Sequence, residues 1–437
     1  MSLVAKLEAY FEFSRLGTSW RTEIVAGVTT FMTMAYIVFV NPSILHDAGM
    51  PIAAVTAATC LAAALGSILM GVFARYPIAL APGMGLNAYF AYAVVKGMGV
   101  PWQTALGAVF ISGVAFLVLT AVGVRQMIVH AIPHELYAAV AAGVGLFIAL
   151  IGFKNAGLVV ANPATLVGLG DLHHPEPLLA IFGLLVTAVL LAARVNAAIL
   201  CGVVATWVVA LATGNAHLSG GSSGISGLSE TAFHLDIAAA ARLGLLDIVF
   251  VFLFVDLFDN VGTLLAVGRK AGLFEGAGDV PRLNRILYCD AVATVAGSLA
   301  GTSTVVSYIE SSAGVAAGGR SGVTAIVTGL LFVVAMFAVP LVGAIPGSAT
   351  APALIIVGSM MMTAATEIAW ADPEVAVPAF LTMLAIPLTF SIANGLAFGF
   401  CAWTLIKIGR GKFRDLNWMV LVLTALFVAR FWYMKGA

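Results

Sequence analysis

The scarcest feature of this 437-residue sequence is charge, since Asp, Glu, Lys and Arg together make up 9% of it. An ordinary soluble domain carries about 25% charged residues. Hydrophobic residues make up 62%, and the mean hydropathy is +1.08. The chain is therefore predicted to be an all-α polytopic membrane protein. Its 20 basic and 20 acidic residues cancel, so no nucleic-acid partner is expected.

Motifs for metal, redox and nucleotide chemistry are also missing. The four cysteines lie in or beside apolar runs, which argues against a disulfide framework. The seven histidines fall in loops or at the ends of runs, and His134-Glu135 lacks the second histidine of a zinc protease. No phosphate-binding loop and no signal-peptide pattern is found. We predict no enzyme activity, no metal and no cofactor.

What the sequence does contain is two series of apolar runs, most of them long enough to cross a bilayer as helices. The first series occupies 24–213 and the second 245–408, with about seven runs in each. A polar, Gly/Ser-rich linker at 214–244 separates them. Because seven crossings are an odd number, the second half is predicted to enter the membrane with inverted topology. A loop at 409–415 precedes a last run at 416–434, which either crosses the membrane or lies in its interface.

The distribution of basic residues predicts the orientation. With the N-terminal segment 1–23 inside, fifteen Lys and Arg residues fall on the inner side, and three, Lys96, Lys154 and Arg242, fall outside. An excess of Lys and Arg marks the cytoplasmic side of a membrane protein. We therefore predict a cytoplasmic N-terminus and an extracytoplasmic linker at 214–244.

The third run of each half is interrupted. One reads RYPIALAPGMGLNAYFAYAVV and the other GTSTVVSYIESSAGVAAGGRSG, and both pass from a short extended-looking piece into a short helix. Interrupted segments at matching positions in two halves point to a transporter binding site at the bilayer midplane. Short strands and half-length helices are predicted at both places.

An acidic cluster interrupts the run at 245–268. Asp256 and Asp259 are three residues apart, and Asp256 and Asn260 are four apart, so all three share one helical face. An acid at bilayer depth costs about 2.5–3.5 kcal/mol on insertion scales, and such residues are functional by default. The alternative is a buried carboxylate that only bonds a neighbouring helix.

The interrupted run of the second half carries a further acid. Ser307, Glu310, Ser311 and Gly314 recur at helical spacing and form one small, polar face. Small residues alone would be explained by close helix packing, but packing does not require an acid.

In the first half Asn87 offers an amide, and Thr33 a hydroxyl that could equally bond another helix. Phe258 is the first aromatic candidate for the site, with Phe31 and Tyr89 as further candidates. No Lys or Arg is central in the runs, so the predicted site repels anions and favours cations or neutral hydrogen-bonding solutes.

Four segments in order resemble a known family: TTFMTMAYIVFVNPSIL, ALAPGMGLNAYFAY, FVDLFDNVGTLLAVGRKAGL and GTSTVVSYIESSAGVAAGGRSGVTAIVTGLLF. They are similar to the AzgA-like purine permeases, a branch of the nucleobase–cation symporters related to nucleobase/ascorbate transporters. The resemblance covers nearly the whole chain. It implies fourteen transmembrane helices in two inverted seven-helix repeats, 24–213 and 245–408, with helices 3 and 10 half-length. It also implies a core domain (24–124 plus 245–342) and a gate domain (134–213 plus 348–408).

The resemblance also implies a function. It is proton-coupled uptake of a purine nucleobase such as guanine, hypoxanthine or adenine, across the inner or plasma membrane, often by a homodimer. On the family's motifs, Asp256 is the essential helix-8 acid, Asp259 its second acid, Glu310 the base-binding acid and Asn87 the helix-3 amide. Our predicted substrate-binding residues are Glu310, Asp256, Asn87, Ser311, Phe258 and Thr33. Proton coupling is assigned to Asp256 and Asp259, with the proton gradient as driving force and an elevator as mechanism.

Alternatives remain open at this stage. A xanthine or uracil carrier would have the same fold. An anion carrier of this fold, a non-transporting receptor or an intramembrane acid-dependent enzyme fits the acids less well.

Overall fold

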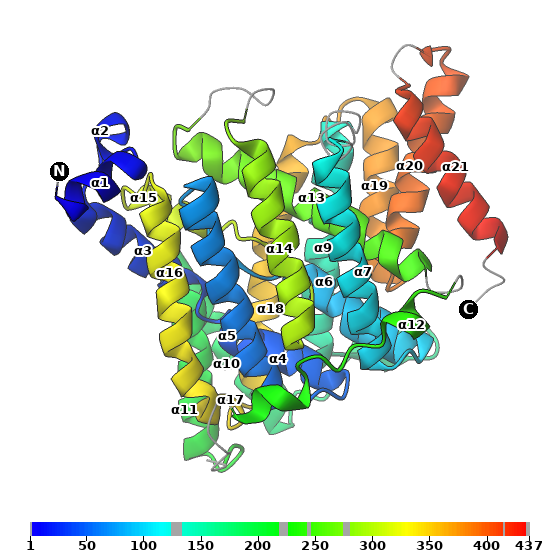
Figure 1. Cartoon of the computed structure of the whole chain (residues 1–437). Coiled ribbons are helices and arrows are strands. Elements are labelled where there is room, and N and C mark those ends of the chain that lie inside the picture. Colours follow the sequence, from blue (N-terminus) through cyan, green and yellow to red (C-terminus); the bar gives the residue numbers. More distant parts are fainter. Residues whose placement is uncertain are drawn as a thin grey trace.

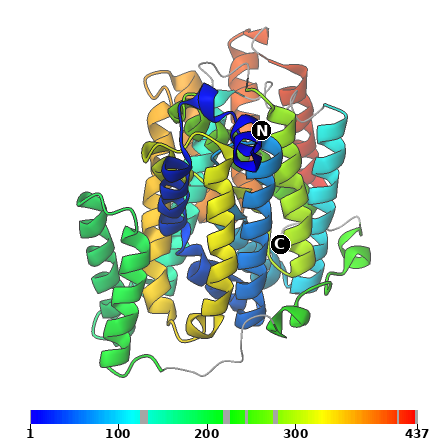
Figure 2. The same cartoon turned by 60° about the vertical axis from the view of Figure 1, so that its left-hand side comes forward.

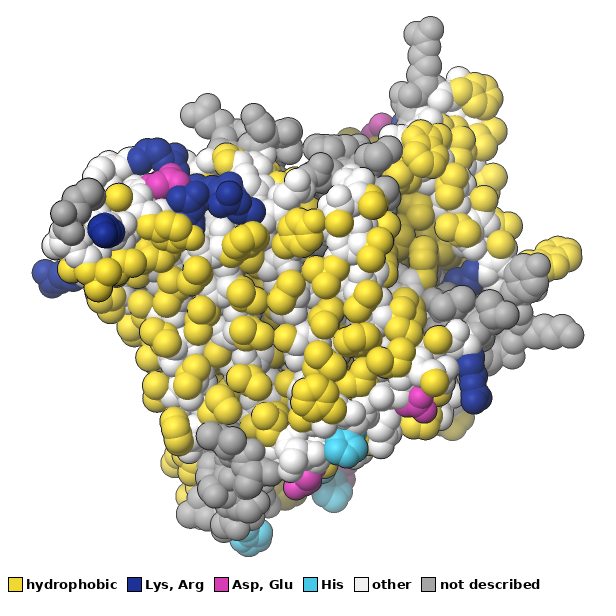
Figure 3. Space-filling view, viewed as in Figure 1, with side chains coloured by type: hydrophobic (Ala, Val, Ile, Leu, Met, Phe, Trp, Pro, Cys, Tyr) yellow, Lys and Arg dark blue, Asp and Glu magenta, His cyan; other side chains and the backbone are white. Residues whose placement is uncertain are grey.

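The computed structural model describes residues 2–123, 133–217, 226–242, 246–273, 280–413 and 416–433. Most of this is helical, and the helices form one bundle (Figure 1). On the face seen in Figure 3, hydrophobic side chains cover most of the bundle, and several Lys and Arg side chains gather around the end that carries the N-terminus. In the described part of the chain, seven helices are long and apolar enough to cross a membrane, and shorter apolar helices accompany them. The protein is a polytopic membrane protein.

The first half of the chain runs from the N-terminal helices to the linker. Its elements are α1 (Leu3–Tyr10), α2 (Phe13–Leu16), α3 (Trp20–Met34), α4 (Ile37–Asp47), α5 (Ile52–Leu69), the π-helical turn η1 (Met70–Ala74), β1 (Leu80–Pro82), α6 (Met84–Ala88), the π-helical η2 (Tyr89–Gly97), α7 (Trp102–Ala121), α9 (His134–Asn155), β2 (Val159–Asn162), β3 (Leu166–Leu169), α10 (Pro175–Ala192) and α11 (Ala198–Ala212).

The second half begins after two short helical turns in the linker. The elements are η3 (Ser226–Glu230), α12 (Ile237–Ala240), α13 (Leu246–Lys270), α14 (Leu283–Ala300), β4 (Val305–Ser307), α15 (Ser311–Ala316), α16 (Gly322–Ala335), η5 (Met336–Ala338), α17 (Val339–Val342), α18 (Gly347–Met361), η6 (Met362–Glu367), α19 (Pro373–Leu388), α20 (Ile392–Gly409) and α21 (Trp418–Tyr433).

The two interrupted segments meet as a short antiparallel pair of strands. In β1 and β4, Leu80 faces Ser307 and Pro82 faces Val305. A Cβ atom at Gly83 would lie 2.9 Å from a methyl carbon of Val306, so a larger residue would require the Val306 side chain or the strands to shift. Each strand is followed by helix, α6 then η2 in the first half and α15 in the second. A strand is therefore observed at both places where the sequence predicts one.

The helices pack in two groups. In one, α5 packs against α14 and α16, α7 against α13 and α14, and α3 against α15 and α16. In the other, α9 packs against α18 and α19, α18 against α10 and α11, and α19 against α20. Figure 2 shows α10 and α11, in green, as a pair at one edge of the bundle. The groups touch where α6 and α13 pack against α9 and where α4 packs against α18.

Two local features differ from the sequence prediction. The first apolar run forms one span, Trp20–Asp47, but its regular helical hydrogen bonding is interrupted at Ala35–Tyr36, between α3 and α4. The connection after α9 is a hairpin, with Val159 of β2 opposite Leu169 of β3. Its turn is stabilised by the Asn162 side chain, which accepts a hydrogen bond from the backbone N–H of Ala164 at 2.9 Å. The hairpin lies outside the hydrophobic pattern that marks helices, so the run analysis missed it.

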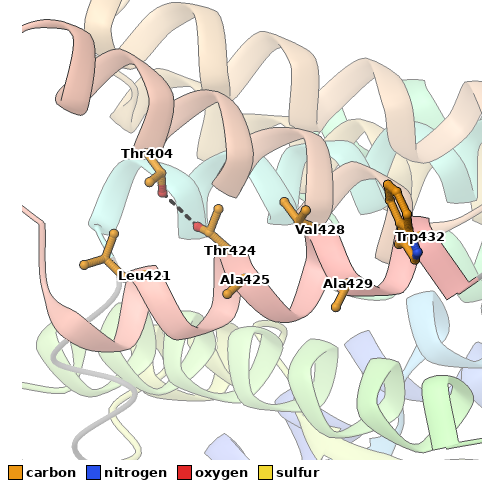
Figure 4. A pocket seen from close by; sticks show the side chains of 7 residues that line it. All are labelled: Thr404, Leu421, Thr424, Ala425, Val428, Ala429 and Trp432. Atoms are coloured by element: carbon orange, nitrogen blue, oxygen red, sulfur yellow. Dashed lines mark hydrogen bonds between the residues drawn. The ribbon is translucent and has the colours of Figure 1, made fainter.

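The last helix, α21, packs along α20. The Thr404 and Thr424 hydroxyls, one on each helix, are 2.8 Å apart and hydrogen-bonded (Figure 4). Beside them the two helices leave an apolar groove of about 510 Å³ that extends along α21 to Trp432. The ring of Phe427 is buried and packs against Phe250 of α13 and Phe400 of α20. The described part of the last run, α21, is thus a helix docked on the bundle along one face.

Candidate functional site

The site is built where the β1–β4 pair meets α4 and α13. Backbone hydrogen bonds extend the pair at both ends, since Gly83 N–H donates to the Thr304 carbonyl at 2.9 Å and Tyr308 N–H donates to the Ala79 carbonyl at 3.0 Å. The strands end in the middle of the bundle, so their flanking residues are presented there instead of at a surface. All six strand residues are buried.

Glu310 lies at the start of α15, as the residue before its first turn. Its carboxylate accepts a hydrogen bond of 2.6 Å from the hydroxyl of Tyr36, at the break between α3 and α4. The Tyr36 side chain is fully buried. Thr33 donates its hydroxyl to the carbonyl of Thr30 at 2.7 Å, and its oxygen lies 3.5 Å from the Glu310 backbone carbonyl. The α3–α4 break therefore positions the acid of the second half.

Asp256 is held by its neighbour one helical turn along α13. The side-chain amide of Asn260 donates to Asp256 Oδ1 at 2.7 Å, and the Asn260 carbonyl oxygen accepts from the backbone N–H of Ser307 at 2.8 Å. A backbone N–H can only donate, so the orientation of the Asn260 amide is fixed. Asp256 is fully buried. The cluster predicted on one helical face is thereby joined to β4.

Asp259 lies beside Gly83, the residue that follows strand β1. One of its carboxylate oxygens lies 3.7 Å from the position that a Cβ of Gly83 would take. It is also within electrostatic range of Glu310 and of Asp290, an acid buried in α14. Three acids from α13, α14 and the start of α15 therefore share one interior region.

Asn87 lies in α6, one turn after Gly83, and is fully buried. Its amide donates to the side-chain carbonyl of Asn41 in α4. The Asn41 amide in turn donates to the hydroxyls of Thr59 at 2.6 Å and Thr302 at 3.1 Å. The helix-3 amide of the sequence prediction is thus part of a polar chain that runs through α4, α5 and the segment before β4.

The remaining predicted site residues are Ser311 and the aromatic candidates, and they make different contacts in the structure. The Ser311 hydroxyl accepts from the backbone N–H of Ala79 at 3.0 Å, which ties α15 to the chain before β1. The Phe258 side chain lies outside the described residues. Of the other aromatic candidates, Phe31 packs edge-on against Phe332 with ring centroids 5.2 Å apart, and Tyr89 packs against Phe252 at 5.4 Å.

Two contributors were missed as site residues by the sequence analysis. Tyr36 and Asn41 are 274 and 46 residues away from the partners they hold, Glu310 and Asn87. The available signal was the composition of the first run, which places a tyrosine and an asparagine in an apolar stretch ending Asn41-Pro42. Buried polar groups need partners, and no partner is found locally.

The site combines carboxylate acceptors with hydroxyl groups, which can both donate and accept. Its acids are met by the Tyr36 hydroxyl and the Asn260 amide. Among the described residues, the buried hydroxyls of Ser303, Thr304 and Ser307 have no hydrogen-bond partner. Carboxylates accept N–H donors when ionised and can carry a proton when neutral. Such a site suits an uncharged solute rich in N–H groups, and it suits exchange of a proton.

Comparisons with known proteins agree with this chemistry. A family model described as "Permease family" matches residues 21–398. The adenine permease AdeP of Escherichia coli is 46% identical over 97% of this chain and 95% of its own length. The guanine/hypoxanthine permease PbuG of Bacillus subtilis is 46% identical over 98% of this chain and 100% of its own length.

Solved structures support the fold. The transmembrane domain of the cyanobacterial bicarbonate transporter BicA superposes with a TM-score of 0.64 over 87% of this chain and 97% of that domain, at 12% identity. The structure of SLC26A9 gives 0.65 over 93% of this chain and 69% of that one, at 10% identity. These matches show a shared transporter fold, whereas the sequence relatives show the family. These comparisons confirm the resemblance to the AzgA-like purine permeases. The chain belongs to the permease family and is a transport protein, not an enzyme.

Proposed function

We propose that this protein takes up purine nucleobases such as guanine, hypoxanthine or adenine by symport with protons. One observation carries the proposal: acids from α13 and from the start of α15 converge beside the β1–β4 crossing, in a chain 46% identical to adenine and guanine/hypoxanthine permeases. Purine bases are neutral, planar and rich in N–H groups. Carboxylates in a membrane interior can bind such groups and can also carry the coupling proton.

The two acids are given separate roles. Glu310, held by Tyr36, accepts N–H groups of the base. Asp256, with Asp259 one turn away on α13, carries the proton. Asn260 supports this division, because it holds Asp256 Oδ1 and fixes that carboxyl group against β4. Asn87, Ser311, Thr33 and Phe258 complete the proposed binding site.

The proposed mechanism is an elevator built on fourteen helices in two inverted seven-helix repeats. The packing of α3, α5, α7, α13, α14 and α16 into one group supports a core domain. The packing of α9, α10, α11, α18, α19 and α20 into another supports a gate domain. Both interrupted segments belong to the core, so the bound base would cross the membrane together with the strands that hold it.

The proposed location is the cell membrane, with the N-terminus in the cytoplasm. Basic residues assigned to the inner side from both halves meet at one end of the molecule, where Arg75 and Arg282 contact Glu12 at 3.1 and 3.3 Å. Lys407 and Lys412 likewise meet Glu374 at 2.9 and 2.8 Å. The functional unit is proposed to be a homodimer in the lipid bilayer.

Uptake measured in cells that lack their own base carriers tests the function. Cells producing the protein should accumulate a radiolabelled purine, and a protonophore should abolish the accumulation. Competition by adenine, guanine, hypoxanthine, xanthine and uracil then ranks the bases. Preference for xanthine or uracil would assign the alternative substrate within the same fold. Uptake of bicarbonate without uptake of any base would overturn the proposal, and so would the absence of all transport at normal surface abundance.

A further inference from the structure

The hydrogen bonds that connect Asn87, Asn41 and Thr59 all run in the same donor-to-acceptor direction. The Thr59 hydroxyl donates to the Val55 carbonyl in its own helix at 2.6 Å, and the Asn41 amide donates to the Thr59 oxygen, also at 2.6 Å. The Asn41 carbonyl oxygen then accepts from the amide of Asn87. Asn41, Thr59 and Asn87 are all fully buried, so solvent does not compete for these bonds.

This direction follows from counting donors. A threonine hydroxyl has one hydrogen, and in Thr59 that hydrogen is given to Val55, so Thr59 can only accept from Asn41. Asn41 must therefore turn its NH₂ group toward Thr59 and its carbonyl toward Asn87. Asn87 must in turn direct its NH₂ group toward Asn41. The orientation of an amide, which its shape alone does not reveal, is fixed here by its partners.

This orientation leaves the carbonyl oxygen of Asn87 as a hydrogen-bond acceptor without a donor in the described structure. Among the described residues the Asn87 carbonyl oxygen is buried and has no hydrogen-bond partner. Leaving such a group unpaired is unfavourable, and native proteins rarely do so without a ligand, a water or a functional reason. Asn87 lies one helical turn, about 5.4 Å of rise, after Gly83, where the backbone comes close to Asp259.

We propose that Asn41 is a positioning residue that presents the carbonyl oxygen of Asn87, and not its NH₂ group, to the transported base. A carbonyl oxygen at this position selects a base that offers an N–H donor on the edge that faces Asn87. A base with an unprotonated ring nitrogen or a carbonyl oxygen at that position would place its own acceptor against the Asn87 carbonyl oxygen. Two acceptors cannot form a hydrogen bond, so such a base would be rejected. The inference rests on the proposed function and extends it, because it assigns specificity to a residue that does not touch the base.

The experiment compares affinities of the purified protein for the best base of the competition panel and for its derivatives methylated at each N–H position in turn. In wild type, methylation should weaken binding most at the N–H positions read by Glu310 and by Asn87. A neutral hydrogen bond contributes an affinity factor of about 2 to 12. Asn41→Leu should lower the methylation penalty at the Asn87 position by this factor, since it removes the partner that orients the Asn87 amide. Thr59→Val should lower it by less, because the Asn41 amide keeps Thr302 as an acceptor at 3.1 Å.

Two variants serve as controls. Thr56 lies one turn before Thr59, is equally buried, and donates its hydroxyl to the Ile52 carbonyl at 2.7 Å, but it makes no hydrogen bond to Asn41 in the described structure. Thr56→Val should keep the wild-type selectivity, and Thr59→Ser, which retains the hydroxyl, should keep it too. A merely structural role of the chain would weaken binding of all derivatives equally and leave their ratios unchanged.

The outcomes separate this inference from the proposed function. If wild type binds no base, the proposed function fails. If wild type binds a base, but Thr59→Val and Asn41→Leu leave the affinity ratios as in wild type, the positioning role of Asn41 is refuted while the proposed function stands. Loss of the methylation penalty at one position in Asn41→Leu, a smaller loss in Thr59→Val and no change in Thr56→Val support it.

Discussion

Removing the Tyr36 hydroxyl should weaken base binding by releasing Glu310. In the structure the carboxylate of Glu310 is held at 2.6 Å by this single described side-chain donor, from a ring that is fully buried. Tyr36→Phe keeps the ring and its packing and deletes only the hydroxyl. The carboxylate then becomes free to sample other rotamers before the base arrives.

The magnitude follows from the cost of ordering that side chain again. Immobilising a flexible side chain on binding costs about 0.5–1.5 kcal/mol. At about 1.4 kcal/mol per factor of ten, Tyr36→Phe should raise the Kd for the base by roughly 2- to 12-fold. Titration calorimetry on purified protein, or competition against a labelled base, measures this directly.

A matched control is available in the same half of the chain. Tyr76 is almost fully buried, and its hydroxyl donates to the Pro281 carbonyl at 2.7 Å, away from the acids. Tyr76→Phe removes the same atoms and should leave the Kd unchanged. In a Glu310→Ala background Tyr36→Phe should have no further effect, because no carboxylate remains to be held. An equal loss of affinity in both backgrounds would refute the reasoning.

Four further outcomes are expected. Glu310→Gln should weaken base binding about 10- to 150-fold, the equivalent of a 1.5–3 kcal/mol hydrogen bond to a charged group, and unchanged affinity would remove Glu310 from the site. Asp256→Asn should retain exchange of bases across a vesicle membrane but lose pH-driven accumulation; concentration of base with normal pH dependence would contradict the proton role. In a cysteine-less protein, Ser229→Cys should react with an impermeant thiol reagent in intact cells and Lys412→Cys should not, and the reverse would invert the topology. Truncation after Arg414 should reduce abundance more than uptake per molecule, and loss of uptake at normal surface abundance would place α21 in the transport machinery.

The sequence determined the class of the protein and the location of its acids. Low charge and long apolar runs leave no alternative to a membrane-embedded helical chain, because a surface of that composition needs lipid around it. The acids were found for the same reason, since a carboxylate within such a run is costly and therefore rare. Asp256, Asp259 and Asn260 share a helical face through local spacing alone, and the observed Asn260–Asp256 bond is a local contact of this kind. Whether these acids bind base and proton stays a prediction.

The tertiary structure decided which residues meet. Strand β1 pairs with β4 across 227 positions of sequence at Leu80 and Ser307, and no pattern within either segment specifies that register. The same holds for Tyr36 on Glu310 and for the chain from Thr59 through Asn41 to Asn87. Sequence periodicity reports how a helix faces its surroundings, because burial repeats with the helical turn. The identity of a polar partner depends on the packing of helices distant in sequence, and only the folded chain brings those groups within hydrogen-bonding distance.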